Sequence, residues 1–242
     1  MTVLRILHLY PKELGINGDG GNVLALAERA RWRGVDVDVV EHRPGAELPA
    51  SADLVHIGSG PLSSQRAVAG DVARIAPLLR QWRDGGVPIL AIAGGWQLLG
   101  EEIVTPDGEI LPGAGVFPTR AVLGARRHVA EVVVRMRDGV ALAGFENHSA
   151  TTTLTADASG AAPLGDVVSG FGNGDQTEGV LLGNAIGTHL HGPVLPMNPV
   201  LADRMLQTAL RGELPPVPQT ERVDRYARNA RRAIAARLGV AL

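Results

Sequence analysis

The chain has 242 residues, of which 45% are hydrophobic, and its formal net charge is -2. This length allows one sizeable domain with a real core, and the composition is typical of a soluble globular protein. The near-neutral charge excludes a general basic field for nucleic acid, and the absence of cysteine excludes disulfides, thiolate metal sites and cysteine catalysis in this chain.

The first hundred residues alternate between predicted strands and helices. Apolar runs predict strands over 3–10 and 87–93, alternation predicts a strand over 35–42, and 52–60 is interpreted as a strand followed by a glycine loop. Helical spacing of apolar residues predicts helices over 21–34, 65–86 and 94–103. No apolar run approaches the roughly 18 residues of a membrane span, and the N-terminus lacks the features of a signal peptide, so we expect a cytoplasmic protein. The alternation predicts an α/β fold with a parallel sheet and right-handed crossovers.

The second half of the chain has a different pattern. Short strands divided by glycine turns, partly antiparallel, are predicted over 126–136, 140–154, 166–172 and 179–192. A helix follows over 199–212, then the proline-rich stretch "ELPPVPQT", then an amphipathic helix with an arginine-rich face, which is either solvated or in contact with a partner. We therefore expect one domain over 1–212, with a linker and an appended helix over 213–242.

The stretch "IAGGWQ" holds the most informative turn. A strand that ends in a tight turn and enters a helix raises one side chain above the carboxyl edge of the sheet, where open α/β folds bind ligands. The next backbone N–H then points at that site, as in a nucleophile elbow with its oxyanion hole. Here the apex is Ala93 and the next N–H belongs to Gly94. A methyl group cannot attack a carbonyl, and on this stretch alone an ordinary strand-to-helix turn is an equally good interpretation.

Several motifs together resemble one family. "LHLYPKELGINGDGGNVLALAERARWRG", "IAGGWQLLG", "GAGVFPTRAVLGARRHVAEVVV", "GFENHSATTTL" and "GTHLHGPVLPMNPVLAD" follow one another over roughly residues 4 to 210. In this order they resemble the class I glutamine amidotransferases of the cobyric acid synthase-like group, especially the glutamine amidotransferase subunit of lipid II isoglutaminyl synthase. The resemblance implies a flavodoxin-like three-layer α/β sandwich with a mostly parallel central sheet. It implies no cofactor and no metal.

The resemblance also assigns roles to individual residues. In the family the elbow reads approximately G-I-C-G-G-Y-Q, so Ala93 occupies the position of the nucleophilic cysteine. His191, in "HLHGP", matches the general base. The other implied roles are the oxyanion hole for Gly94 and Gly60, and substrate binding for Arg127 and Gln97. The family's carboxylate-binding arginine corresponds either to Arg127 or to the adjacent Arg126.

The resemblance implies one function for an intact relative and another for a chain with alanine at the nucleophile position. An intact relative hydrolyses glutamine and passes ammonia to a Mur-ligase-like ATP-dependent subunit, which amidates the D-glutamate of lipid II in peptidoglycan synthesis. With Ala93 we expect no hydrolysis; the alternative is a non-catalytic glutamine-binding subunit, or a scaffold or regulatory subunit. The loop "GSGPLSSQ" also departs from the family's G-G-G-Q-D-x-E-Q, which favours a natural replacement of the cysteine over a laboratory one. We expect neither nucleic acid nor a membrane span.

Other residues admit simpler interpretations. Ser63, Ser64 and Ser149 are poor substitutes for the missing nucleophile, because none lies in an elbow and each would need a base in reach. His189 and His191 share a strand face, but no spacing fixes further metal ligands. "ENH" (146–148) is either catalytic support or a buried polar network. "GINGDGGN" lacks the Lys-Ser/Thr of a phosphate loop, so we interpret it as a turn and helix cap. With 3% aromatic residues, a flavin site is a weak alternative.

Overall fold

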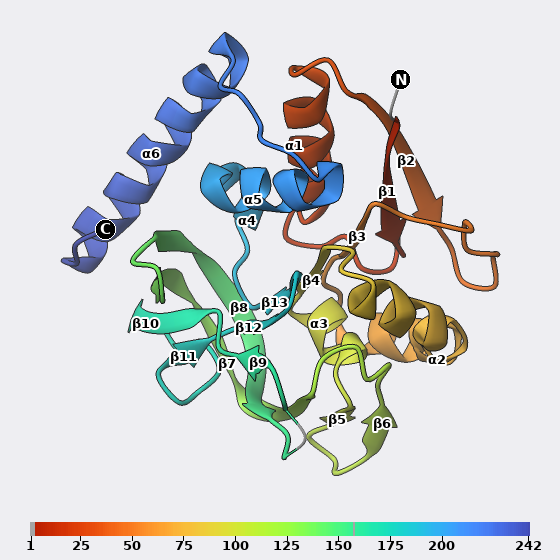
Figure 1. Ribbon diagram of the computed structural model, residues 1–242. Coiled ribbons are helices and arrows are strands. Elements are labelled where there is room, and N and C mark those ends of the chain that lie inside the picture. The colour runs from red at the N-terminus through yellow and green to blue at the C-terminus, as the bar shows by residue number, and fades with distance from the viewer. Residues whose placement is uncertain (1–2, 157) are drawn as a thin grey trace.

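The computed structural model describes residues 3–156 and 158–242. Its main sheet has seven strands (Figure 1), in the order β2 (Asp36–His42), β1 (Val3–Leu9), β3 (Leu54–Ile57), β4 (Ile89–Ile92), β13 (Ala185–Thr188), β12 (Val180–Leu182) and β9 (Ala161–Ala162). The first five strands are parallel, and β12 and β9 are antiparallel to their neighbours. The predicted parallel sheet is confirmed, and β4 at its centre is apolar throughout because both of its faces are buried.

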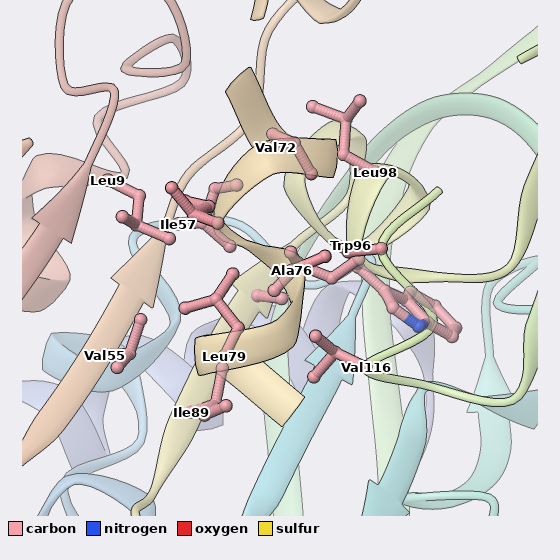
Figure 2. Close-up of a cluster of buried hydrophobic side chains, with 14 of the residues drawn as sticks. Leu9, Val55, Ile57, Val72, Ala76, Leu79, Ile89, Trp96, Leu98 and Val116 are labelled. Atoms are coloured by element: carbon pink, nitrogen blue, oxygen red, sulfur yellow. The ribbon is translucent and has the colours of Figure 1, made fainter. Parts of the chain in front are cut away.

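Helices cover both faces of this sheet, which gives the three layers that the resemblance implied. One face packs against α2 (Leu62–Asp84), and Figure 2 shows Val72, Ala76 and Leu79 of this helix beside Val55 and Ile89 of the sheet. The other face packs against α1 (Gly20–Arg31), the short α4 (Val194–Met197) and α5 (Pro199–Leu210). Successive side chains of a strand point to opposite faces, so β1 contributes to both cores.

A second sheet lies beside the first and carries the remaining strands. Its order is β11 (Thr177–Glu178), β10 (Gly165–Ser169), β7 (Thr119–Met136), β5 (Glu102–Val104) and β6 (Ile110–Pro112), and β8 (Ala141–Leu154) pairs with β7. The predicted antiparallel pairing is confirmed. The predicted strand over 140–154 agrees with β8, whereas β7 has 18 residues and begins before the predicted 126–136, because its largely exposed first half continues through a register shift.

The last helix, α6 (Pro218–Leu238), packs against the rest of the chain (Figure 1). Ile234 joins Val133 and Ala143 in a small third core. The buried Arg29 of α1 forms ion pairs of 2.6 Å with both Asp203 of α5 and Asp224 of α6. The division into 1–212 and 213–242 stays a prediction. Within the described residues, no helix combines the length and apolarity needed to cross a membrane.

Candidate active site

The turn after β4 has the geometry of an elbow. Ala93 has φ 40° and ψ -105°, a backbone conformation that is rare and strained for a residue with a side chain, and it caps the six-residue helix α3 (Gly94–Leu99). A Cβ at Gly95 would lie 2.3 Å from the carbonyl oxygen of Gly58, and one at Gly94 would lie 2.8 Å from that of Gly60. The turn is therefore pressed against the loop after β3, and only glycine fits at these two positions.

A cavity of about 200 Å³ opens above this turn. Five of the six residues with a predicted role line it: Ala93, Gly94, Gly60, Gln97 and Arg127. Ala93 is only 2% exposed, so it forms the floor of the cavity. The fold thus brings together residues from the ends of β3 and β4 with residues of the β7–β8 ribbon, although the sequence separates them widely.

Two backbone amides lie side by side at the floor of the cavity. The N–H of Gly94 is directed at the side-chain oxygen of Ser59, 3.4 Å away. A Cβ built on Gly94 would lie 3.2 Å from the backbone nitrogen of Gly60, so the two predicted oxyanion-hole residues are neighbours. Adjacent donors of this kind can share one negatively charged oxygen.

His191 has a buried carboxylate partner. Its Nδ1 lies 3.0 Å from Oδ1 of Asp19, and both side chains are nearly inaccessible to solvent. An Nδ1–H that donates to this carboxylate leaves the lone pair on Nε2, and within the described residues Nε2 has no hydrogen-bond partner. This is the arrangement that a general base needs.

Asp19 is the functional residue that sequence reasoning missed. The interpretation of "GINGDGGN" as a turn and helix cap is confirmed, since Asp19 is the N-cap residue of α1, but its side chain makes no capping hydrogen bond. Its Oδ2 instead accepts the N–H of Ser59 at 2.9 Å. Asp19 and His191 are 172 positions apart, so no local spacing could have indicated the pair.

His191 does not line the cavity above Ala93. It lines an adjacent cavity of about 430 Å³, and Asn147 lines both. A chain of hydrogen bonds nevertheless joins the base to the elbow. It runs from His191 to Asp19, then to the backbone N–H of Ser59, and the side chain of Ser59 meets the N–H of Gly94.

Arg127 stands at the rim of the cavity on β7. Its Nε donates to Oδ1 of Asn147 at 2.6 Å, and one terminal nitrogen donates to the Asn147 carbonyl oxygen at 3.1 Å. Arg127 lines the cavity and the adjacent Arg126 is not among its lining residues, so the structure favours Arg127 of the two. A guanidinium held in this way still has N–H groups with which to bind a carboxylate.

Buried amides form a polar wall of the cavity. Nε2 of Gln65 donates to Oε1 of Gln97 at 3.1 Å and to the carbonyl oxygen of Gly60 at 3.2 Å. Gln97 therefore braces the loop after β3 through Gln65, a residue for which the sequence analysis assigned no role. Among the serines considered as substitute nucleophiles, Ser149 lines the cavity, whereas Ser63 is exposed at the start of α2.

His189 contacts a different set of residues from His191. Its ring stacks on His148 with centroids 3.8 Å apart, and it also contacts Trp96. Burial, together with repulsion from His148 and His191, holds the pKa of His189 well below its usual value of 6.5. Among residues 3–156 and 158–242 no group of three or more possible metal ligands gathers.

Glu146 of the "ENH" motif anchors a loop. Its carboxylate accepts the backbone N–H groups of Phe171 and Gly172, at 2.8 and 2.9 Å. Burial alone would raise the pKa of Glu146, but His148, whose Nε2 lies 3.5 Å from Oε2, and the hydrogen bonds from these two amides outweigh it and lower the pKa. These contacts support the interpretation of the motif as a buried polar network.

Comparison with known families agrees with this geometry. Residues 5–199 match the CobB/CobQ-like glutamine amidotransferase domain. The chain is 33% identical to the GatD subunit of the glutamine-hydrolysing lipid II isoglutaminyl synthase of Staphylococcus aureus, over 86% of this chain and 85% of that protein. It is also 33% identical to the corresponding subunit of Streptococcus pneumoniae, over 86% of this chain and 81% of that protein.

Solved structures share the fold at lower sequence identity. A crystal structure of a glutamine amidotransferase superposes with a TM-score of 0.58 at 18% identity, covering 84% of this chain and 98% of that one. The glutaminase domain of the Trypanosoma brucei CTPS, with bound acivicin, gives a TM-score of 0.53 at 14% identity, covering 88% and 96%.

Proposed function

The chain belongs to the CobB/CobQ-like glutamine amidotransferase family, and from this premise we propose that it is the glutamine-binding subunit of an enzyme that amidates lipid II. The observation that carries the proposal is the cavity in which Ala93, Gly94, Gly60, Gln97 and Arg127 meet. As written, the chain binds glutamine without hydrolysing it, because the apex of the elbow carries a methyl group.

Three residues of the cavity, and His191 beside it, have tasks in this proposal. Arg127 binds the α-carboxylate of glutamine. The N–H groups of Gly60 and Gly94 face the side-chain carbonyl oxygen, and Nε2 of His191 accepts the proton of an attacking nucleophile. With cysteine at position 93, a thiolate would add to the amide, ammonia would leave, and water would release glutamate from the thioester. Ala93 has no lone pair, so the covalent step cannot begin.

The proposal includes a partner and an acceptor. The relatives are named as subunits of lipid II isoglutaminyl synthase, so we propose that this chain joins a Mur-ligase-like ATP-dependent subunit. That subunit would activate the D-glutamate carboxylate of lipid II in peptidoglycan synthesis, and this chain would supply or gate its nitrogen source. The absence of cysteine suits a reducing compartment, so a cytoplasmic location is part of the proposal.

Glutamate release tests this function. The unaltered chain should release no glutamate from glutamine, and Ala93→Cys should release glutamate at a measurable rate. Ala73→Cys, which places the same thiol on the exposed face of α2, is the matched control and should stay inactive. Glutamate release by the unaltered chain at the rate of Ala93→Cys would show that another group is the nucleophile.

The second candidate function is a purely structural or regulatory subunit that binds the partner alone. Ala93 favours this function, because a subunit that does not hydrolyse glutamine can still serve its partner through its folded surface. Glutamine binding separates the two functions: a scaffold has no need of the ligand, whereas a glutamine-binding subunit does.

A further inference from the structure

Ser59 is a buried residue of the loop after β3, next to the elbow. It is 4% exposed and lines the cavity above Ala93. Both of its backbone polar groups are engaged: its N–H donates to Asp19 at 2.9 Å, and its carbonyl oxygen accepts the N–H of Ile16 at 3.1 Å. These two bonds hold the backbone of Ser59 in place, so only rotation of its side chain remains free.

The hydroxyl of Ser59 contacts the backbone N–H that follows the apex of the elbow. Its Oγ accepts the N–H of Gly94 at 3.4 Å. That N–H belongs to the first turn of α3, where no intrahelical carbonyl is available to it. It is also the N–H that directly follows the apex, which is the position where an oxyanion would be held.

We propose that the Ser59 hydroxyl occupies the oxyanion position at Gly94 and slows glutamine hydrolysis independently of Ala93. This inference rests on the proposed function, since it concerns the same cavity. In the family the loop resembles G-G-G-Q, where the position of Ser59 has no side chain. The chain would therefore carry two separate obstacles, a missing nucleophile and an occupied oxyanion hole.

The surrounding structure leaves the loop no room to retreat. Gly58 is packed so closely that a Cβ there would lie 2.2 Å from the carbonyl oxygen of Leu14, and one at Gly60 would lie 2.6 Å from that of Glu13. The substrate oxygen must therefore displace the hydroxyl itself. Displacing a neutral hydrogen bond of this kind costs a factor of roughly 2–10 in rate.

The test compares two variants that both carry a thiol at the apex. Ala93→Cys combined with Ser59→Ala should have a kcat roughly 2–10-fold higher than Ala93→Cys alone, with a similar KM, because the hydroxyl competes with the oxyanion of the transition state for the Gly94 N–H. Ala93→Cys combined with Ser63→Ala, which removes an exposed hydroxyl from the same loop region, should match Ala93→Cys alone. Ala93→Cys combined with Ser59→Thr keeps the hydroxyl and should keep the low kcat of Ala93→Cys alone.

Two results would overturn the inference. The first is equal kcat with and without the Ser59 hydroxyl, including no turnover in either variant. The second is a lower kcat on removal of the hydroxyl, which would mean that Ser59 assists the oxyanion. Calorimetry with glutamine on the variant that carries both Ala93→Cys and Ser59→Ala separates a failure of this inference from a failure of the proposed function. Binding without a gain in kcat refutes this inference alone, whereas an absence of binding refutes the proposed function as well.

Discussion

At the scale of single residues, the strained turn of the elbow is present although its apex residue, Ala93, carries no nucleophile. A non-glycine residue at φ 40° costs on the order of 1–3 kcal/mol, and the structure retains this conformation at Ala93. The surroundings impose it: the N–H of Ala93 bonds to the carbonyl oxygen of Thr188 at 2.8 Å, and the two following glycines pack on the loop after β3. The turn is therefore maintained by packing, whatever side chain stands at its apex.

Local and distant residues differed in how well the sequence could predict them. The turn at Ala93 was predictable because strand, turn and helix are adjacent in the chain. Asp19 and Ser59 were not, because their roles depend on contacts with His191 and Gly94 that only the folded chain creates. The resemblance to a family indicated His191 and Arg127, and physical pattern alone would have left both as ordinary polar residues.

The Asp19–His191 pair leads to a prediction about stability. Asp19→Asn keeps the size of the side chain but removes the charge that strengthens its hydrogen bonds to His191 and to the N–H of Ser59. We expect a loss of about 1.5–3 kcal/mol in the free energy of unfolding, measured by urea denaturation. Asp84→Asn, at an exposed ion pair, is the control and should change stability by less than about 0.5 kcal/mol. Equal effects of the two substitutions would contradict the structural role of Asp19.

At the scale of secondary structure, the parallel strands and long helices were predictable and the ribbon was not. Strands β1, β3 and β4 are largely apolar because both of their faces are buried, although Arg5 and His8 interrupt β1 and His56 lies in β3. The first half of β7 is largely exposed, so it has no such signal, and its length depends on its pairing with β8. Helix α3 is shorter than expected, because the chain turns at Gly100 into β5.

The junction of β4 and α3 allows a matched pair of glycine substitutions. Gly95→Ala would place a Cβ 2.3 Å from the carbonyl oxygen of Gly58, so we expect a loss of about 3 kcal/mol in the free energy of unfolding. Gly70→Ala in the exposed face of α2 meets nothing within 4 Å and should stabilise the protein by roughly 0.5–1 kcal/mol. Thermal denaturation of both variants checks the prediction, and a tolerated Gly95→Ala would contradict the close approach of loop and turn.

At the scale of the whole molecule, the carboxyl edge of the main sheet collects the site. The ends of β3, β4 and β13 supply Ser59, Ala93 and His191, and the β7–β8 ribbon closes the cavity from the second sheet. Helix α6 lies beyond residues 5–199, the part that matches the family domain. Arg29 ties this helix to α1 and α5 through its two ion pairs.

The buried histidines predict how global stability depends on pH. The pKa of His189 is well below 6.5 in the folded protein because of burial and the nearby His148 and His191, and it returns to about 6.5 on unfolding. Protonation therefore favours the unfolded chain. The stabilisation is complete above about pH 6.5 and is lost as the pH falls through the lowered pKa.

Chemical denaturation across this pH range measures the effect. His189→Gln should flatten the decline of the free energy of unfolding below pH 6.5, because glutamine does not titrate. An unchanged decline in this variant would mean that His189 does not contribute to it.

Calorimetric titration of the unaltered chain with L-glutamine, with assay of the same sample for glutamate, tests the central claim most directly. The account predicts saturable binding of one glutamine per chain and no glutamate, because the cavity is present and Ala93 has no group that could attack the amide. Absence of binding at millimolar glutamine, or the appearance of glutamate, would contradict it.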